Sequence, residues 1–235
     1  DSLFLLDIYE ASETPIKGIS SKRLLESIKQ NGKSNACHSS DKSIINDIKH
    51  SSNDFDILVS DAGSSYYVSS IMFAKMKYQR YITSGAQADM GFALPAAIGC
   101  SFATDSCHRI HAITGDGSLQ LNIQELQTLK TYKRNLTLYV LNNNGYLSIR
   151  STQNRFFHGR QCGTDSSNGV EFPELSKIAD AYGIQYFKFN KINSFISFLK
   201  NNKDYIGPQI VEILCPDDEE IIPRVFAEKD ENGNI

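Results

Sequence analysis

The sequence lacks several features that would place it in common classes of protein. It has no run of about 18 apolar residues, so it predicts no transmembrane helix. Its first residues, Asp1-Ser2-Leu3-Phe4, lack the basic start of a signal peptide. Its 24 basic and 27 acidic residues are mixed along the chain, without the basic face of a nucleic-acid-binding protein. We therefore expect a cytoplasmic protein that binds neither nucleic acid nor a membrane.

The Cys-x-x-Cys spacing of many zinc sites is also missing. The five cysteines are odd in number, which argues against a disulfide framework and fits reduced thiols in a cytoplasm. Cys37-His38 and Cys107-His108 could each supply a fragment of a metal site. Adjacent residues rarely converge on one metal ion, however, and no second pair stands at zinc-finger spacing. We therefore expect no zinc site.

The composition that is present resembles that of an ordinary folded protein. Hydrophobic residues make up 40% of the chain and charged residues 22%, so a packed core is expected. The 235 residues are enough for one α/β domain with attached segments. We predict a connector with short helices over residues 1–53, the main domain over 54–226, and a flexible, charged tail over 227–235.

Within the main domain, apolar runs of strand length alternate with segments of helical period. This alternation is typical of parallel βαβ units. The strands are apolar without alternation, as expected when helices cover both faces of a sheet. The sequence therefore predicts a doubly wound α/β fold with a mainly parallel sheet. The expected strands are Ile57–Ser60, Tyr81–Ser84, Arg109–Thr114, Leu136–Leu141, Ile184–Phe189 and Gln209–Leu214; the expected helices are Ser64–Lys75, Met90–Ala103, Leu119–Tyr132, Pro173–Tyr182 and Ile192–Asn201.

The first chemical signal stands where one expected strand ends. Gly115-Asp116-Gly117 follows the strand directly, before a helical segment that opens at Ser118. Flanking glycines permit a tight turn and a close backbone approach to a ligand. A helix N-terminus suits a phosphate, and Asp116 could supply an oxygen to a divalent cation bound to that phosphate. A Gly-Asp-Gly sequence alone, however, is most often just a strand-to-helix turn.

A second signal stands at the end of the next expected strand, where the chain reads Asn142-Asn143-Asn144-Gly145-Tyr146. If the two strands are neighbours in a parallel sheet, their carboxyl ends open into the same crevice. The amide oxygen of Asn143 could then complete a magnesium-like shell without adding charge. Paired asparagines alone are most often a solvated turn.

Together the two signals resemble the signature of the thiamine-diphosphate enzymes, in which Gly-Asp-Gly is followed about 25 residues later by Asn-Asn. Here Asn143 lies 27 residues after Asp116. The segment Thr83–Gly99 also resembles the chain under the thiamine in acetohydroxyacid synthases, pyruvate oxidases and benzoylformate decarboxylases. In all, the resemblance covers residues 54–224.

The resemblance implies specific roles. Met90 would hold the cofactor in a bent conformation, where the alternative is ordinary core packing. The Ala88 carbonyl would accept a bond from the aminopyrimidine. The loop over residues 60–65 resembles one that contacts the diphosphate, although a simple glycine turn explains it equally well. The implied cation ligands are Asp116, Asn143 and Gly145. The implied cofactor-binding residues are Ala62, Gly63, Ser64, Ser65, Ala88, Met90, Gly115, Asp116, Gly117, Ser118, Asn143, Gly145, Tyr146 and Leu147.

The resemblance also implies that this chain is one part of a larger active site. Members of the family have a pyrimidine-binding domain, a middle domain that can hold FAD, and a diphosphate-binding domain, and only the third is matched here. The glutamate that activates the aminopyrimidine belongs to the first domain, normally of a partner subunit. We therefore expect no catalytic residue in this chain, a homodimer or homotetramer, and no activity of the chain alone. Glu125 stands in the helix after Gly-Asp-Gly and is expected to be structural.

Three functions remain open at this point. The first is decarboxylation of a 2-keto acid with transfer of the two-carbon unit to a carbonyl acceptor, as in acetolactate-synthase-like enzymes. The second is a simple decarboxylase or carbon–carbon hydrolase of the same family, and the third is a nucleotide-binding module without catalysis. The absence of tryptophan departs from true acetohydroxyacid synthases, which carry one after the cation ligands. The pattern from Tyr146 to Gln153, with Glu220–Arg224 near the end, looks more like synthase-like enzymes of bacterial surface-sugar pathways.

Overall fold

The structure is a computed structural model that describes residues 3–5, 36–38, 56–73, 80–85, 87–105 and 108–218. The chain divides into two compact units, Asp1–Ser52 and Asn53–Ile235. In the first unit, β1 (Leu3–Leu5) pairs in parallel with β2 (Ala36–His38). The short helices expected near residues 24–28 and 44–48, Cys107 and the tail over 227–235 lie outside the described residues, so these expectations stay predictions.

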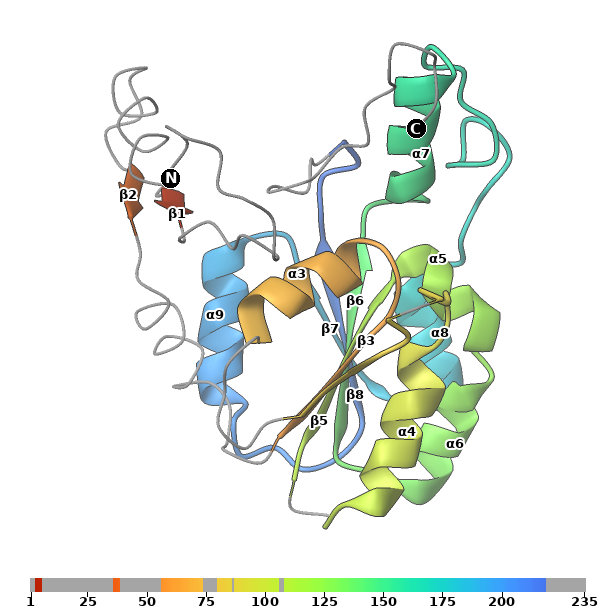
Figure 1. The fold of residues 1–235 in the computed structure, drawn as a ribbon. Helices are drawn as coiled ribbons and strands as arrows, with labels where there is room; N and C mark the ends of the chain where they lie inside the picture. Colours follow the sequence, from red (N-terminus) through yellow and green to blue (C-terminus); the bar gives the residue numbers. More distant parts are fainter. Residues whose placement is uncertain are drawn as a thin grey trace. The chain divides into compact units, whose positions relative to one another are not determined.

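The second unit is built on a six-stranded sheet in which every pair of neighbouring strands is parallel (Figure 1). The order across the sheet is β4-β3-β5-β6-β8-β7. The strands are β3 (Ile57–Ser60), β4 (Arg80–Thr83), β5 (Ile110–Gly115), β6 (Leu136–Asn142), β7 (Gln185–Phe189) and β8 (Gln209–Leu214).

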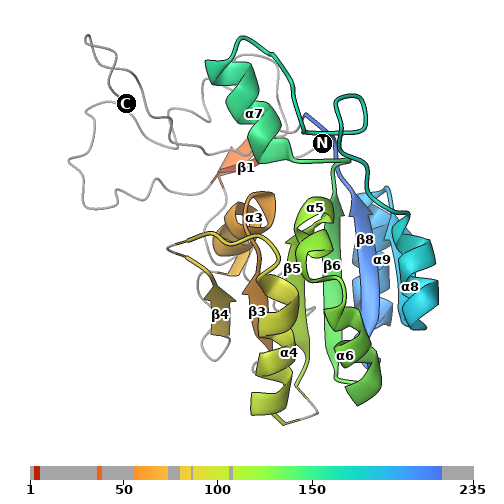
Figure 2. The same ribbon diagram turned by 90° about the vertical axis from the view of Figure 1, so that its right-hand side faces the viewer.

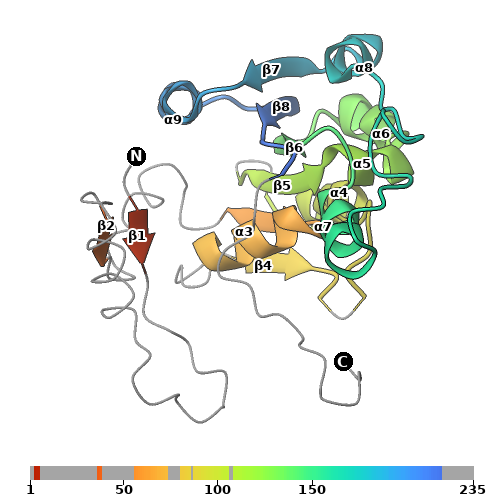
Figure 3. The ribbon, with the colours of Figure 1, turned by 90° about the horizontal axis from the view of Figure 1, so that it is seen from above.

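Helices cover both faces of this sheet, as the view from above makes clear (Figure 3). One face carries α3 (Ser64–Phe73) and α9 (Ile192–Asn201), and the other carries α4 (Ala93–Ala103), α6 (Glu125–Tyr132) and α8 (Leu175–Tyr182) (Figure 1). The predicted doubly wound α/β fold is confirmed. None of the helices in the described ranges has the length and apolar content that crossing a membrane requires.

Burial explains why the strands read as continuous apolar runs. The central strands β3, β5, β6 and β8 lie between the two helical layers, so side chains on both of their faces leave solvent. The core residues that they supply include Leu58, Val59, Ile110, Ala112, Leu138, Val140, Ile210 and Val211.

The chain changes direction across the sheet between β3 and β5. From β3 it continues to β4 on one side, whereas from β5 it continues to β6 on the other side (Figure 2). Open α/β sheets bind ligands at such a switch point, outside the carboxyl ends of the strands. Asp61, Asp116 and Asn143 stand at the carboxyl ends of β3, β5 and β6.

Two segments differ from the sequence prediction. The helix expected over Leu119–Tyr132 is broken into α5 (Asp116–Leu119), the 3-10 helix η1 (Gln120–Asn122) and α6. The polar stretch after β6 contains a further helix, α7 (Leu147–Phe156), which the sequence did not predict. Its only buried residue is Arg150, so α7 has no apolar stripe that could have revealed it.

Candidate functional site

Asp116 connects the ends of the two central strands. It follows β5, and its carboxylate is buried where the loop after β6 passes over it. Oδ1 accepts a hydrogen bond from the N–H of Gly117, and Oδ2 accepts one from the N–H of Gly145, both at 2.9 Å. β5 and β6 pair in parallel, as the argument from sequence required. The Gly-Asp-Gly turn and the asparagine-rich loop therefore form one site.

The electrostatics of Asp116 leave room for a cation. Burial raises the pKa of its carboxyl group, whereas the hydrogen bonds from Gly145 and Gly117 and the charge of Arg150 lower it. Burial dominates, so the ionised carboxylate lacks part of the stabilisation that water would give. A divalent cation beside it would supply that stabilisation.

The side-chain oxygen of Asn143 is available to a ligand. Its side chain is buried, and its amide oxygen Oδ1 has no hydrogen-bond partner in the described part of the chain. A buried carbonyl oxygen without a partner costs about 1–3 kcal/mol. Amide and carboxylate oxygens such as those of Asn143 and Asp116 are ligands that Mg²⁺ prefers. Asp116 and Asn143 therefore fit the cation that the family resemblance implies.

Arg150 fixes the loop that carries Asn143, a role that the sequence did not reveal. It is buried on α7, and its Nη2 donates to the carbonyl oxygen of Asn143 at 2.8 Å. Its Nη1 donates to the carbonyl oxygen of Asn144 at 3.3 Å and lies 3.7 Å from Oδ2 of Asp165. Because the guanidinium occupies the main-chain oxygens, the side-chain oxygen of Asn143 is left for another partner.

Gly145 and Gly117 are glycines for steric reasons. Gly145 has φ +144°, and an added Cβ would lie 2.0 Å from the carbonyl oxygen of Thr164. That same oxygen accepts the N–H of Tyr146 at 2.8 Å. At Gly117 an added Cβ would lie 2.3 Å from Cε1 of Tyr146, whose ring meets that of Phe172 edge to face. The backbone at Gly117 and Gly145 is therefore packed closely by the loop that follows β6.

Not every expected feature of the phosphate site is present. The helix α5 after Gly-Asp-Gly has only four residues, so its dipole is small. The N–H of Gly117 is already used by the carboxylate of Asp116. The N–H of Gly117 is therefore not free for a phosphate, and the cofactor-binding roles of Gly115, Gly117 and Ser118 stay predictions.

Asp61 organises the site, although only its loop, residues 60–65, and not its carboxylate, was singled out from the sequence. It is buried after β3, and its Oδ1 accepts the N–H of Gly91 at 2.9 Å. Its Oδ2 accepts the N–H of Ala93 at 3.2 Å and the hydroxyl of Thr114 at 2.9 Å. The carboxylate thus stabilises the start of α4 and joins it to the ends of β3 and β5.

The segment before α4 has an unusual backbone. Ala88 has φ +53°, a left-handed conformation that costs a residue with a side chain free energy and is common at functional sites. Its N–H donates to the carbonyl oxygen of Ser84 at 2.7 Å. The neighbouring Gly91 carbonyl accepts a bond from Nδ2 of Asn122 at 2.8 Å. Met90 between them is 44% exposed, so the alternative of core packing does not hold.

The loop over residues 62–65 reaches the same edge of the sheet. Gly63 has φ +65°, and an added Cβ there would lie 3.3 Å from Oγ of Ser148, in the first turn of α7 next to Leu147. An added Cβ at Gly91 would lie 3.3 Å from the carbonyl oxygen of Ser118. The four predicted segments, around residues 63, 90, 116 and 145, therefore lie at one end of the sheet.

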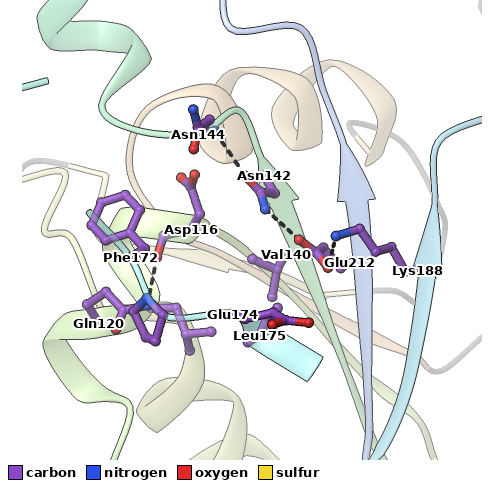
Figure 4. A pocket seen from close by; sticks show the side chains of 12 residues that line it. Asp116, Gln120, Val140, Asn142, Asn144, Phe172, Glu174, Leu175, Lys188 and Glu212 are labelled. Carbon is purple, nitrogen blue, oxygen red and sulfur yellow. Dashed lines mark hydrogen bonds and ion pairs between the residues drawn. The ribbon is translucent and has the colours of Figure 1, made fainter. Parts of the chain in front are cut away.

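A pocket opens beside Asp116 on the side of β8 and β7. Its wall runs from Asp116 and Asn144 past Phe172 to Lys188 and Glu212 (Figure 4). Along one side of it, Glu212 contacts both Asn142 and Lys188. Glu125, in contrast, lies in the first turn of α6 and accepts a bond from the hydroxyl of Thr128 at 3.0 Å, in line with a structural role.

The fold and this donor set define a cofactor-binding α/β domain, and comparison with known proteins identifies it. The family model described as thiamine pyrophosphate enzyme, C-terminal TPP binding domain, matches residues 61–213. This chain therefore belongs to the thiamine pyrophosphate enzymes, as the sequence resemblance predicted.

The similar proteins agree with that assignment. The acetolactate synthase large subunit of Porphyra purpurea is 32% identical over 160 residues, which cover 68% of this chain and 27% of that protein. The acetolactate synthase of Arthrospira platensis is 32% identical over 147 residues, 63% of this chain and 25% of that protein. The chain thus spans about a quarter of the length of these relatives.

A solved structure shares the fold. The thiamine diphosphate-dependent 4-hydroxybenzoylformate decarboxylase of Rhodococcus jostii RHA1 superposes with a TM-score of 0.60 at 22% identity. The match covers 75% of this chain and 33% of that one. This likeness agrees with the assignment of the chain to the C-terminal TPP binding domain family.

Proposed function

We propose that this chain holds the diphosphate of thiamine diphosphate through a Mg²⁺ ion in an enzyme that decarboxylates a 2-keto acid and transfers the resulting two-carbon unit to a carbonyl acceptor. The observation that carries the proposal is the unpartnered, buried Oδ1 of Asn143 in the loop that Gly145 ties to Asp116. Two oxygen donors of different charge at the switch point of the sheet suit a cation that also binds diphosphate.

In this proposal, Asp116, Asn143 and Gly145 hold the cation. Gly117 lets the ring of Tyr146 pack against the Gly-Asp-Gly turn, which presents its backbone to the diphosphate. Asp61 positions the start of α4 and the turn before it, which carries Met90. This turn limits where the cofactor rings can lie. When bound, the cofactor supplies a nucleophilic thiazolium carbon and stabilises the carbanion left by decarboxylation. The chain's own task is to anchor and orient it.

The activating carboxylate is assigned to a partner domain. None of the described residues is a carboxylate that the family resemblance links to the aminopyrimidine. We therefore propose that a pyrimidine-binding domain, in the same chain or a partner subunit, completes the active site, and that the assembly is a homodimer or homotetramer. The match to acetolactate synthases over a quarter of their length supports an active site shared in this way.

Calorimetric titration of the full-length protein with thiamine diphosphate and Mg²⁺ tests the proposal. Asp116→Ala should abolish magnesium-dependent binding, because the diphosphate loses its charged link to the protein. Asn143→Ala should weaken binding less, because one neutral ligand is lost and water can replace it. Asp180→Ala, which removes an exposed carboxylate on α8, should bind like the parent.

Parental affinity in both site variants would refute the cation site. Tight binding of ATP or NAD without any response to thiamine diphosphate would instead indicate a nucleotide-binding module. Product analysis with pyruvate and a carbonyl acceptor then separates the carboligase, which forms an acyloin, from a simple decarboxylase, which releases the aldehyde.

A further inference from the structure

Glu212 is a buried carboxylate that none of the roles above uses. It lies in the middle of β8 and is only 2% exposed. In the sheet register it stands opposite Val140 of β6 on one side and Lys188 of β7 on the other. Side chains two residues apart on a strand share a face, so Asn142 lies on the same face as Val140, one step nearer the carboxyl end of β6.

The carboxylate of Glu212 accepts three polar contacts on that face. Nδ2 of Asn142 donates to Oε1, and the hydroxyl of Tyr186 donates to Oε2. The ammonium of Lys188 lies 3.3 Å from Oε2 and balances the charge (Figure 4). These contacts join β6, β7 and β8 below the candidate cation site.

Asn142 links Glu212 to the loop from Asn143 to Gly145, which we call the cation loop. While its Nδ2 donates to Glu212, its Oδ1 accepts the N–H of Asn144 at 2.9 Å (Figure 4). A carboxylate offers only acceptors, so Glu212 fixes which end of the Asn142 amide faces the strand and which faces the loop. Asn144 has φ +58° and stands between the two candidate ligands Asn143 and Gly145.

The cation loop is thus held from three directions. Arg150 binds the carbonyl oxygens of Asn143 and Asn144, and Asp116 binds the N–H of Gly145. The Asn142 side chain binds the N–H of Asn144. Stability alone does not call for a charged group here, because a well-packed apolar residue can replace a buried ion pair at no net cost.

We infer that Glu212 is a positioning residue for the cation site, which acts through Asn142 to preorganise the loop from Asn143 to Gly145. The inference rests on the proposed function, because it assumes that this loop binds the cation. Residues that hold a metal ligand in place without touching the metal typically contribute about 10- to 100-fold to metal affinity.

The test measures Mn²⁺ binding to the full-length protein by electron paramagnetic resonance, with thiamine diphosphate present. Glu212→Gln should weaken Mn²⁺ binding by about tenfold. It should also speed deuterium exchange of the 142–146 backbone in the cation-free protein, because a glutamine can present a donor where Asn142 needs an acceptor. Asn142→Ala should have the same two effects, and the double variant should bind Mn²⁺ no more weakly than Asn142→Ala alone.

Tyr186→Phe is the matched control, since it removes another hydrogen bond to Glu212 and leaves Asn142 in place. It should lower the melting temperature but keep Mn²⁺ affinity within about twofold of the parent. Parental Mn²⁺ affinity in either Glu212→Gln or Asn142→Ala, or additive losses in the double variant, would overturn the inference. Asn142→Ala carries this test by itself if Glu212→Gln fails to fold. If Asp116→Ala also leaves Mn²⁺ binding intact, the proposed function itself is at fault.

Discussion

The carboxylate of Asp116 accepts the N–H of Gly145 at 2.9 Å, across 29 residues of chain. This bond joins the turn after β5 to the loop after β6, and it places two of the three candidate cation ligands in direct contact. A change in the geometry of either loop should therefore alter the geometry of the other.

Gly145→Ala should disrupt this contact. The added Cβ would meet the carbonyl oxygen of Thr164 at 2.0 Å, and φ +144° is unfavourable for alanine. We expect a loss of about 2–4 kcal/mol in the free energy of unfolding and loss of magnesium-dependent cofactor binding, measured by urea unfolding and calorimetry.

Gly169→Ala provides the control for backbone strain alone. Gly169 also has a positive φ, +110°, but an added Cβ there would meet no atom within 4 Å. The Gly169→Ala variant should lose about 1 kcal/mol in the free energy of unfolding and keep cofactor binding. Equal effects of the two substitutions would show that the contact with Thr164 does not matter.

Asp61→Ala should be one of the most damaging single substitutions away from the cation ligands. It leaves the N–H groups of Gly91 and Ala93 and the hydroxyl of Thr114 without their acceptor. We expect a loss of about 3 kcal/mol in urea unfolding of the cation-free protein, against less than about 0.5 kcal/mol for the exposed Asp180→Ala. A parental unfolding midpoint for Asp61→Ala would contradict this role.

Met90→Ala should separate turnover from affinity. Its proposed role is to hold the cofactor bent, so kcat should fall at least about tenfold while the affinity for thiamine diphosphate changes by less than about threefold. Met90→Leu, which is similar in bulk, should restore much of the rate. Steady-state kinetics of the complete enzyme check both variants, and parental turnover in Met90→Ala would remove this residue from the site.

Because of Asp116, the free energy of unfolding should depend on pH, and the sign of this dependence should reverse when the cation binds. Burial raises its pKa above the ordinary 3.8, so the cation-free native state holds a proton more tightly than the unfolded chain. The contribution of Asp116 to stability is fully present below its pKa in the unfolded chain. It is lost as pH rises through its pKa in the native state. Relative to Asp116→Ala, the cation-free parent should therefore gain stability as the pH falls from 7 to about 4.

In the proposed site, magnesium competes with that proton. Cation binding requires the ionised carboxylate, so the stabilisation by Mg²⁺ with the diphosphate should grow as pH rises. Thermal unfolding over a pH series, with chelator and then with Mg²⁺ and thiamine diphosphate, measures both trends. The same slope of melting temperature against pH in both series would mean that Asp116 does not bind the cation.

The sequence predicted those parts of the fold that short-range patterns determine. The helix Ile192–Asn201 and the strand Gln209–Leu214 agree with the structure residue for residue, because each is an apolar segment with clear flanking residues. The pairing of β5 with β6 followed from a βαβ unit of ordinary length. The candidate ligands Asp116 and Asn143 were visible because both directly follow a strand.

The supporting residues could not be found in this way. Asp61 acquires its partners from positions 30, 32 and 53 residues away, and Glu212 meets Asn142 across 70 residues. Arg150 lies on a helix that buries no apolar side chain. Only the tertiary fold creates these contacts, so no local pattern in the sequence could reveal them. A buried charged residue inside a strand, such as Glu212, is the one signal that could have been followed.

The isolated chain should show no keto-acid decarboxylation, even with saturating thiamine diphosphate and Mg²⁺. The proposal assigns the activating glutamate to a pyrimidine-binding domain, so adding that domain in trans should switch activity on. Product assays with pyruvate check this, with Asp116→Ala as the control for contaminating enzymes. Robust turnover by the chain alone would place an activating acid within it.

The position of β8 sets the order in which the site can form. This strand comes last among the described elements, yet it lies between β6 and β7, both of which precede it in the chain. Until β8 is inserted, the sheet has a gap beside β6, and Asn142 has no carboxylate to hold it. Contacts of such long range form late, because the loop they close must first be ordered. We therefore expect the loop to be complete only on a fully folded domain, so that cofactor binding would distinguish complete molecules from partly folded ones.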